Sequence, residues 1–172
     1  FTFKIMKAII CAAGRGRRMV NFIKKIPKSL LSLGDKTVIE NLIFDIYGAE
    51  KLMDIFNMGE QSAKTTKKST MVVESHISYN QEVKQGDEVN VNLIYFDHDK
   101  KRLQYKLEMV HKEKKYLAST IEILALYVDL DQRKVAEFEE EKLKIMNDYI
   151  QKNKDKFKND DLKFSSKLKK WK

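Results

Sequence analysis

The stretch "LQYKLEMVH", residues 103–111, decides the fold because apolar and polar side chains alternate along most of it. A period of two places alternate side chains on opposite faces of a strand, so the pattern predicts a strand with one buried face and one wet face. The expected buried set is Leu103, Tyr105, Leu107, Met109 and His111. The expected wet set is Arg102, Gln104, Lys106 and Glu108.

Three neighbouring runs extend this strand into a sheet. In residues 71–79 the apolar face is expected to carry Val73, Ile77 and Tyr79, and in residues 89–95 it is expected to carry Val89, Val91, Leu93 and Tyr95. Residues 116–128 are apolar on both faces, which predicts a more central strand. Short polar turns join the runs, so we expect an antiparallel meander.

Helical patterns flank the strands on both sides. Thr37 stands three residues before Glu40, a capping-box spacing, and apolar residues then recur at helical intervals up to Phe56. Four of them are expected to pack on the sheet, namely Leu42, Ile46, Ala49 and Met53. This predicts one long helix ending near Asn57 and Gly59, followed by a loop over residues 62–69. Residues 137–153 form a second helical pattern. A chain of 172 residues with these elements is expected to form one α+β core.

The charge is concentrated at the two ends of the chain. Residues 1–36 carry nine Lys/Arg against one acid, and residues 151–172 carry nine Lys against three Asp. The total is +9, so the middle is mildly acidic, which favours solubilising and loose basic ends over specific binding of nucleic acid. The single cysteine, Cys11, and the absence of a long apolar run predict a cytosolic protein without a membrane span.

Three segments carry a family resemblance. They are "VVESHISYNQEVKQGDEV" (72–89), "FDHDKKRLQYKLEM" (96–109) and "ASTIEILALYVDLDQRKV" (118–135). Over residues 42–138 the chain resembles hotdog-fold acyl-CoA thioesterases of the 4-hydroxybenzoyl-CoA thioesterase group, in particular the branch associated with carnitine dehydrogenases. The resemblance implies a long central helix wrapped by an antiparallel sheet, a short acyl-CoA substrate and no cofactor. A homodimer or dimer of dimers is expected because a single copy leaves one sheet edge unpaired.

The N-terminal part resembles a different family. The segments "MKAIICAAGRGRRM" (6–19) and "IPKSLLSLGDKTVIENLI" (26–43) are similar to the opening of sugar-phosphate and choline-phosphate nucleotidyltransferases. Residues 7–13 are expected to form a short apolar strand that is followed by a Gly/Arg turn. Glycines and basic residues there would cradle phosphates, and the resemblance assigns this role to Gly14, Arg15, Gly16, Arg18 and Lys28. We expect residues 1–36 to be this fragment, residues 37–138 the hotdog domain, and residues 139–172 a helix with a basic tail.

Thioester hydrolysis needs a helix N-terminus to polarise the carbonyl and a carboxylate to activate water. The segment that carries the thioesterase family's usual Asp is replaced here by the nucleotidyltransferase-like segment. The predicted catalytic candidates are therefore Asp45, Glu50 and Glu122, with Glu74 and Glu82 as further carboxylates. Asp45 and Glu50 also suit the wet face of a helix, and Glu122 must be paired if it is buried.

Six residues are predicted to bind substrate. They are His76, Tyr79, Asn80, Lys100, Lys101 and Arg102. The three basic residues would contact CoA phosphates or form a solvated hairpin, and His76 and Tyr79 should lie on opposite faces of their strand. The motif Asp97-His98-Asp99 favours a polar turn, so no metal is assigned. The predicted function is hydrolysis of a short acyl-CoA, with a non-catalytic CoA-binding or scaffold module, or a nucleotidyltransferase fragment, as alternatives.

Overall fold

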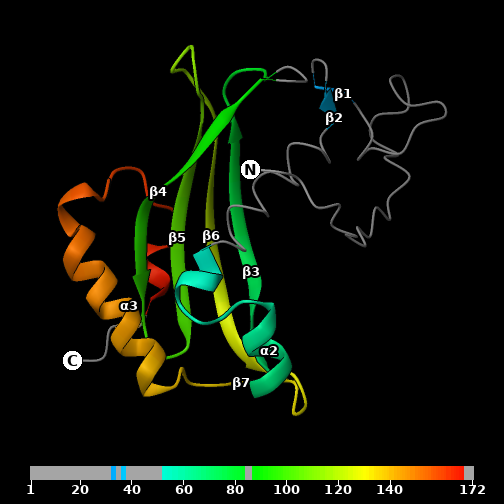
Figure 1. Cartoon of the computed structure of the whole chain (residues 1–172), viewed down its shortest axis with the longest axis vertical. Helices are drawn as coiled ribbons and strands as arrows, with labels where there is room; N and C mark the ends of the chain where they lie inside the picture. Colours follow the sequence, from blue (N-terminus) through cyan, green and yellow to red (C-terminus); the bar gives the residue numbers. More distant parts are fainter. Residues whose placement is uncertain (1–31, 34–35, 38–51, 84–86, 169–172) are drawn as a thin grey trace.

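The computed structural model describes residues 32–33, 36–37, 52–83 and 87–168 (Figure 1). The predicted strand at residues 7–13, the predicted phosphate loop and most of the predicted long helix lie outside the described residues. Strand β1 (Ser32–Leu33) pairs antiparallel with β2 (Lys36–Thr37). Thr37 therefore ends a short strand, and its predicted role as the cap of the long helix stays a prediction, because residues 38–51 lie outside the described residues.

The main sheet is antiparallel and contains four long strands and one short one. They are β3 (Lys68–Tyr79), β4 (Val89–His98), β5 (Arg102–His111), β6 (Leu117–Asp129) and the short β7 (Lys134–Val135). The long strands follow the order β3-β6-β5-β4, and β7 pairs with the end of β6. The predicted meander is confirmed for β4 to β6, but β3 pairs with β6 rather than β4. The apolar character of β6 on both faces agrees with its central place, and β3 lies at an edge of the sheet among the described strands.

The two faces of the sheet are set by the register of β5 and β6. One face, here called the helix-facing side, includes Leu103, Tyr105, Leu107, Ile121 and Ile123. The opposite face, here called the back face, includes Gln104, Lys106, Glu122 and Leu124. The predicted buried set of β5 is confirmed, since all five side chains are buried. The prediction that Gln104 is wet is wrong, because its side chain is 0% exposed.

Irregularities in β3 and β4 move two residues away from their predicted faces. The pairing of β3 with β6 shifts between Val72 and Glu74, so Val73 is an extra residue outside the alternation. The pairing of β4 with β5 shifts between Leu93 and Tyr95, and Tyr95 then lies opposite Lys106 on the back face. A strict period of two cannot anticipate an inserted residue, which explains both errors.

The described end of the predicted long helix covers the helix-facing side. Residues 52–55 are helical, and Asn57 has a φ of 53°, which confirms the predicted left-handed end. A short helix, α2 (Glu60–Thr66), follows where a loop was predicted. The hydroxyls of Thr65 and Thr66 donate hydrogen bonds to the Ser62 carbonyl at 3.1 and 2.8 Å. These local bonds stabilise a short helix that buries no apolar side chain, which explains why no apolar period predicted it.

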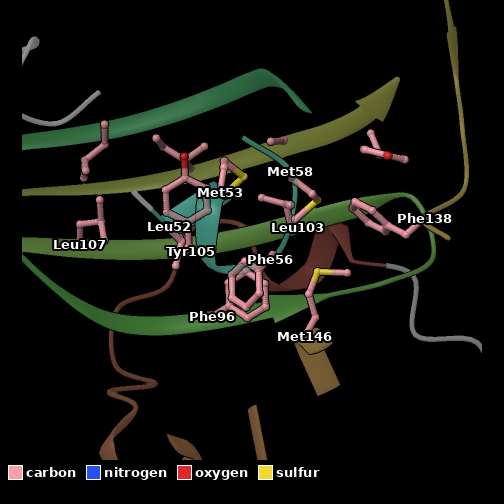
Figure 2. Packing of buried hydrophobic residues seen from close by; sticks show 14 residues of the cluster. Leu52, Met53, Phe56, Met58, Phe96, Leu103, Tyr105, Leu107, Phe138 and Met146 are labelled. Atoms are coloured by element: carbon pink, nitrogen blue, oxygen red, sulfur yellow. The ribbon is translucent and has the colours of Figure 1, made fainter. Parts of the chain in front are cut away.

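The core lies between the sheet, the end of the long helix and α3 (Glu140–Asn153), which confirms the predicted C-terminal helix with a slightly later start (Figures 1 and 2). Phe56 stacks on Phe96 with ring centroids 4.4 Å apart, and Tyr149 of α3 meets Phe56 edge-on at 5.2 Å. Met53 belongs to the same buried cluster, as predicted. Leu42, Ile46 and Ala49, the other predicted contacts of this helix, lie outside the described residues.

The chain after α3 continues over the back face through two 3-10 turns, η3 (Lys154–Lys156) and η4 (Ser165–Lys167). Phe164 and Leu168 are buried against Leu124 of β6. Residues Phe157 to Leu168, here called the C-terminal strap, are thus docked on the sheet, and the predicted loose tail is wrong for this segment. Among the described residues, no helix is long and apolar enough to cross a membrane.

Candidate functional site

The catalytic candidate Glu122 lies on the back face of the sheet. Its neighbours on β6, Ile121 and Ile123, enter the core on the other side. The side chain of Glu122 is 2% exposed and accepts hydrogen bonds from Gln104 Nε2 at 2.8 Å and from the backbone N–H groups of Lys163 and Phe164 at 2.9 Å. The prediction that a carboxylate buried here must be paired is confirmed. These donors come from the chain itself and tie Glu122 to the C-terminal strap.

The other two catalytic candidates, Asp45 and Glu50, lie outside the described residues. The same is true of Gly14, Arg15, Gly16, Arg18 and Lys28, the predicted phosphate-binding residues. Their roles stay predictions. Of the further carboxylates, Glu74 pairs with Lys167 of the strap on the back face, and the backbone carbonyl of Glu82 accepts a 2.6 Å bond from Tyr116 Oη.

The three residues predicted on β3 do not converge on one face. His76 lies opposite Glu122 on the back face, whereas Tyr79 lies opposite Ser119, a residue of the helix-facing side. The predicted separation of His76 and Tyr79 is therefore confirmed. The backbone N–H of Asn80 donates to the Ala118 carbonyl at 2.8 Å, which fixes the chain at the end of the strand. Only Tyr79 of these three is placed toward the side that carries the core.

The basic hairpin between β4 and β5 is held by its own polar groups. Asp99 Oδ1 accepts bonds from the backbone N–H groups of Lys101 and Arg102, both at 2.8 Å, and its side chain is nearly buried. Lys101 Nζ lies 3.3 Å from Glu137 Oε1, and Arg102 Nη1 donates to the Lys167 carbonyl. Asp99 explains why the Asp97-His98-Asp99 motif forms a polar turn. Within the described ranges, no group of three or more His, Cys, Asp or Glu side chains could hold a metal ion.

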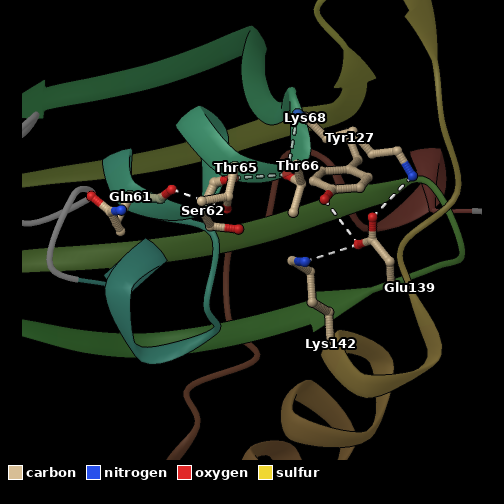
Figure 3. A network of polar contacts seen from close by, with 8 residues as sticks. All are labelled: Gln61, Ser62, Thr65, Thr66, Lys68, Tyr127, Glu139 and Lys142. Carbon is tan, nitrogen blue, oxygen red and sulfur yellow. Dashed lines mark hydrogen bonds and ion pairs between the residues drawn. The ribbon is translucent and has the colours of Figure 1, made fainter.

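A second polar cluster, which the sequence did not reveal, surrounds Glu139 (Figure 3). Lys68 Nζ donates to its Oε1 at 2.9 Å, while Tyr127 Oη and Lys142 Nζ both reach its Oε2 at 2.9 Å. Partial burial alone would raise the pKa of the Glu139 carboxyl, but the donors from Lys68, Lys142 and Tyr127 outweigh it and lower the pKa to about 2. The cluster joins the start of β3, the end of β6 and the start of α3.

Sequence signals for this cluster were incomplete. The three-residue spacing of Glu139 and Lys142 is a helical pairing distance and was visible in the sequence. Lys68 was assigned to a loop, and only the tertiary fold brings it to Glu139. Burial, followed by the hydrogen bond to Glu139, raises the pKa of the Tyr127 phenol, so Tyr127 stays protonated and acts as a donor.

The edge strand β3 leaves apolar side chains uncovered. Met71, Val72 and Val73 are 57%, 58% and 48% exposed, and Tyr79 is 44% exposed. On the neighbouring strand, the buried hydroxyl of Ser119 has no hydrogen-bond partner among the described residues. An exposed apolar edge strand of twelve residues presents backbone groups that can pair with a strand of another chain.

The antiparallel sheet packs one face against a helical layer, which is consistent with the α+β hotdog fold, and solved structures with this fold superpose on the chain. The Staphylococcus aureus protein SAV2348, solved in complex with CoA, has a TM-score of 0.64 at 19% identity, with 83% of this chain and 87% of that chain covered. Slr0204, a 1,4-dihydroxy-2-naphthoyl-CoA thioesterase from Synechocystis, has a TM-score of 0.60 at 16% identity, with 70% and 88% covered. A DHNA-CoA thioesterase from Staphylococcus aureus has a TM-score of 0.62 at 13% identity, with 77% and 90% covered.

The family model of the thioesterase-like superfamily matches residues 41–147, and the chain belongs to this superfamily. The match spans the four long strands and ends within α3, before the C-terminal strap. A comparison with curated protein sequences gives no significant match.

Proposed function

We propose that this chain hydrolyses an acyl-CoA thioester to a carboxylic acid and the free thiol of CoA. The observation that carries this proposal is the match of the thioesterase-like model across the hotdog sheet. Two of the similar folds are thioesterases of an aromatic acyl-CoA, and a third was solved with CoA. The resemblance to the carnitine-dehydrogenase-associated branch supports a short acyl group, including acyl groups with a quaternary ammonium. The single cysteine supports a cytosolic setting.

The catalytic carboxylate is proposed to lie on the long helix rather than on the sheet. Glu122 is enclosed between β6 and the C-terminal strap, with Gln104 and two backbone N–H groups as donors. Water activation requires a carboxylate with room for a water and a substrate carbonyl beside it. Asp45 and Glu50 therefore become the preferred candidates, with the N-terminus of the same helix polarising the thioester carbonyl.

A second copy of the chain is proposed to complete the substrate groove. The exposed apolar residues Met71, Val72 and Val73 lie on the edge strand β3, where a second copy can continue the antiparallel sheet. Tyr79, on the helix-facing side of this edge, would then lie near the interface between the two copies. Replacement of Val72 by Lys should shift the dimer toward monomer in light scattering and lower activity with it. Equal replacement at Val135, an exposed residue of β7, serves as the control.

The activity test is detection of free thiol over a panel of acyl-CoAs. The panel contains short straight-chain, quaternary-ammonium and aromatic acyl groups. Asp45→Asn and Glu50→Gln are compared with Glu113→Gln, which alters an exposed acid in the turn between β5 and β6. We expect one of the first two variants to lose about 100-fold or more in kcat, the scale of a lost general base, while the control keeps its activity. If the wild-type chain releases no thiol from any acyl-CoA of the panel at high protein concentration, the proposed hydrolysis is wrong.

A non-catalytic CoA-binding module is the second candidate. The replacement of the segment that carries the usual Asp favours it, because the fold could then keep the binding surface without the base. Calorimetric titration with CoA, with and without an acyl group, separates the two candidates. Binding without thiol release supports the module, and release of thiol with turnover excludes it.

A further inference from the structure

The C-terminal strap contacts all four long strands of the sheet. The backbone N–H of Lys158 donates to the Ile94 carbonyl of β4 at 2.7 Å, and its ammonium pairs with Glu108 of β5 at 2.9 Å. Lys163 and Phe164 donate to Glu122 of β6, and Lys167 pairs with Glu74 of β3. One short segment therefore links the two edges of the sheet across the back face.

Glu122 holds the middle of the strap. A carboxylate that is 2% exposed needs strong donors in place of water, and backbone N–H groups of Lys163 and Phe164 supply them together with the Gln104 amide. Gln104 is also fully buried, and its Oε1 has no partner among the described residues. Both groups regain water when the strap leaves, so opening the strap leaves no buried charge behind.

The contact is complementary in charge. Three strands contribute the acids Glu74, Glu108 and Glu122 to the back face, and the strap brings Lys158 and Lys167 to two of them. The basic C-terminal end of the sequence is thus partly neutralised by the acidic body of the chain. The strap also lies beyond residue 147, where the superfamily match ends.

The strap is joined to the main core at its first residue, Phe157, which packs against the cluster around Phe56. Beyond Phe157, its apolar anchors Phe164 and Leu168 form a small, separate cluster with Leu124. It contains only a 3-10 turn, η4, and no α-helix or strand. Segments with few apolar contacts and mainly polar ties open at lower free energy than the strands beneath them.

We propose that the C-terminal strap is an electrostatic latch, held by Glu122, that opens as a unit and uncovers the acidic back face while the sheet stays folded. The test is hydrogen–deuterium exchange of the full chain, followed in peptides from the strap and from β6. Raising the salt from about 0.01 M to about 1 M shortens the screening length from about 30 to about 3 Å, and should speed exchange in the strap but not in β6.

Glu122→Ala removes the acceptor of the Lys163 and Phe164 amides. We expect strap exchange to rise about tenfold or more, the scale of lost hydrogen bonds to a charged group, with β6 protection retained. Glu113→Ala, in an exposed turn, is the matched control and should leave both segments as in the wild type. Unchanged strap exchange in Glu122→Ala would overturn the latch. Exchange that rises equally in strap and β6 would also overturn it, because the strap would then open only with the sheet.

A charge exchange keeps the proposal testable if Glu122→Ala does not fold. Lys167→Glu places two acids together and should open the strap, whereas Lys167→Glu combined with Glu74→Lys restores an opposite-charge pair and should restore protection. A double variant that exchanges as fast as the single one would show that charge does not close the strap.

Discussion

The two faces of the sheet are covered in different ways. The helix-facing side is closed by large apolar side chains, with Phe56, Phe96 and Tyr149 in mutual ring contact. The back face is closed by the C-terminal strap through Glu122, ion pairs and the apolar side chains of Phe157, Phe164 and Leu168. The first layer is therefore held mainly by apolar contacts, whereas the second relies more on ion pairs and on a buried carboxylate.

The first prediction concerns the apolar core on the helix-facing side. Phe56 is 0% exposed and stacks on Phe96, so Phe56→Ala should destabilise the chain by about 3–5 kcal/mol through lost burial and an unfilled cavity. The neighbouring Ile55 is 52% exposed, and Ile55→Ala should change the free energy of unfolding by about 0.5 kcal/mol or less. Urea unfolding of both variants measures the contrast. Equal effects would show that the ring cluster is not the main core.

The second prediction concerns the strap on the back face, where truncation of an apolar side chain should cost less stability. Phe164 is 9% exposed but contacts a cluster of only three buried residues, so Phe164→Ala should cost about 1–2 kcal/mol. The control change Asn159→Ala, at an exposed position of the same strap, should cost about 0.5 kcal/mol or less. The same urea measurement applies. A loss as large as that of Phe56→Ala would mean that the strap and the helix-facing side form one cooperative unit.

The same contrast explains what the sequence could predict. The buried set from Leu103 to His111 and the burial of Met53 and Phe56 arise from one dominant apolar face, and these parts of the prediction are confirmed. The order β3-β6-β5-β4 depends on pairing between distant segments, which local periodicity does not contain. Gln104 and Tyr95 were misassigned because the strap hides a polar residue and because an inserted residue in β4 reverses the alternation.

The candidate site was less predictable than the fold. The pairing of a buried Glu122 follows from the cost of burying a charge, and the opposite faces of His76 and Tyr79 follow from the period of two. The partners of Glu122 come from Lys163 and Phe164, some forty positions away in a lysine-rich segment that has no apolar period. Local sequence patterns do not predict a contact between segments this far apart in the chain.

The third prediction concerns the cluster that ties β3, β6 and α3 together. The pKa of Glu139 is lowered to about 2 from 4.5, so the charged form stabilises the folded chain above about pH 4.5 and this contribution is lost as the pH falls toward 2. Glu139 is 35% exposed at its side chain, and after screening we expect about 1 kcal/mol at neutral pH. Glu139→Gln should therefore be less stable than the wild type at pH 7, with the difference shrinking below pH 4.

Glu140→Gln, one position later and exposed, is the control for this pH series. Urea midpoints measured at several pH values give the comparison. A constant difference between Glu139→Gln and the wild type from pH 7 to pH 3 would contradict the assignment to a titrating carboxylate.

The smallest effect on stability is expected for Lys101 of the basic hairpin. Lys101 pairs with Glu137 at 3.3 Å, but both side chains are about half exposed, and such pairs contribute about 0.5 kcal/mol or less. Lys101→Ala should therefore barely move the urea midpoint, whereas Asp99→Ala should cost about 1–3 kcal/mol because it releases two backbone N–H groups.

If Lys101 also contacts CoA phosphates, Lys101→Ala raises the KM for acyl-CoA several-fold at unchanged kcat, since a remote charge contact acts on ground state and transition state alike. An unchanged KM would leave this lysine as part of a surface ion pair and direct the search for the phosphate site away from the hairpin.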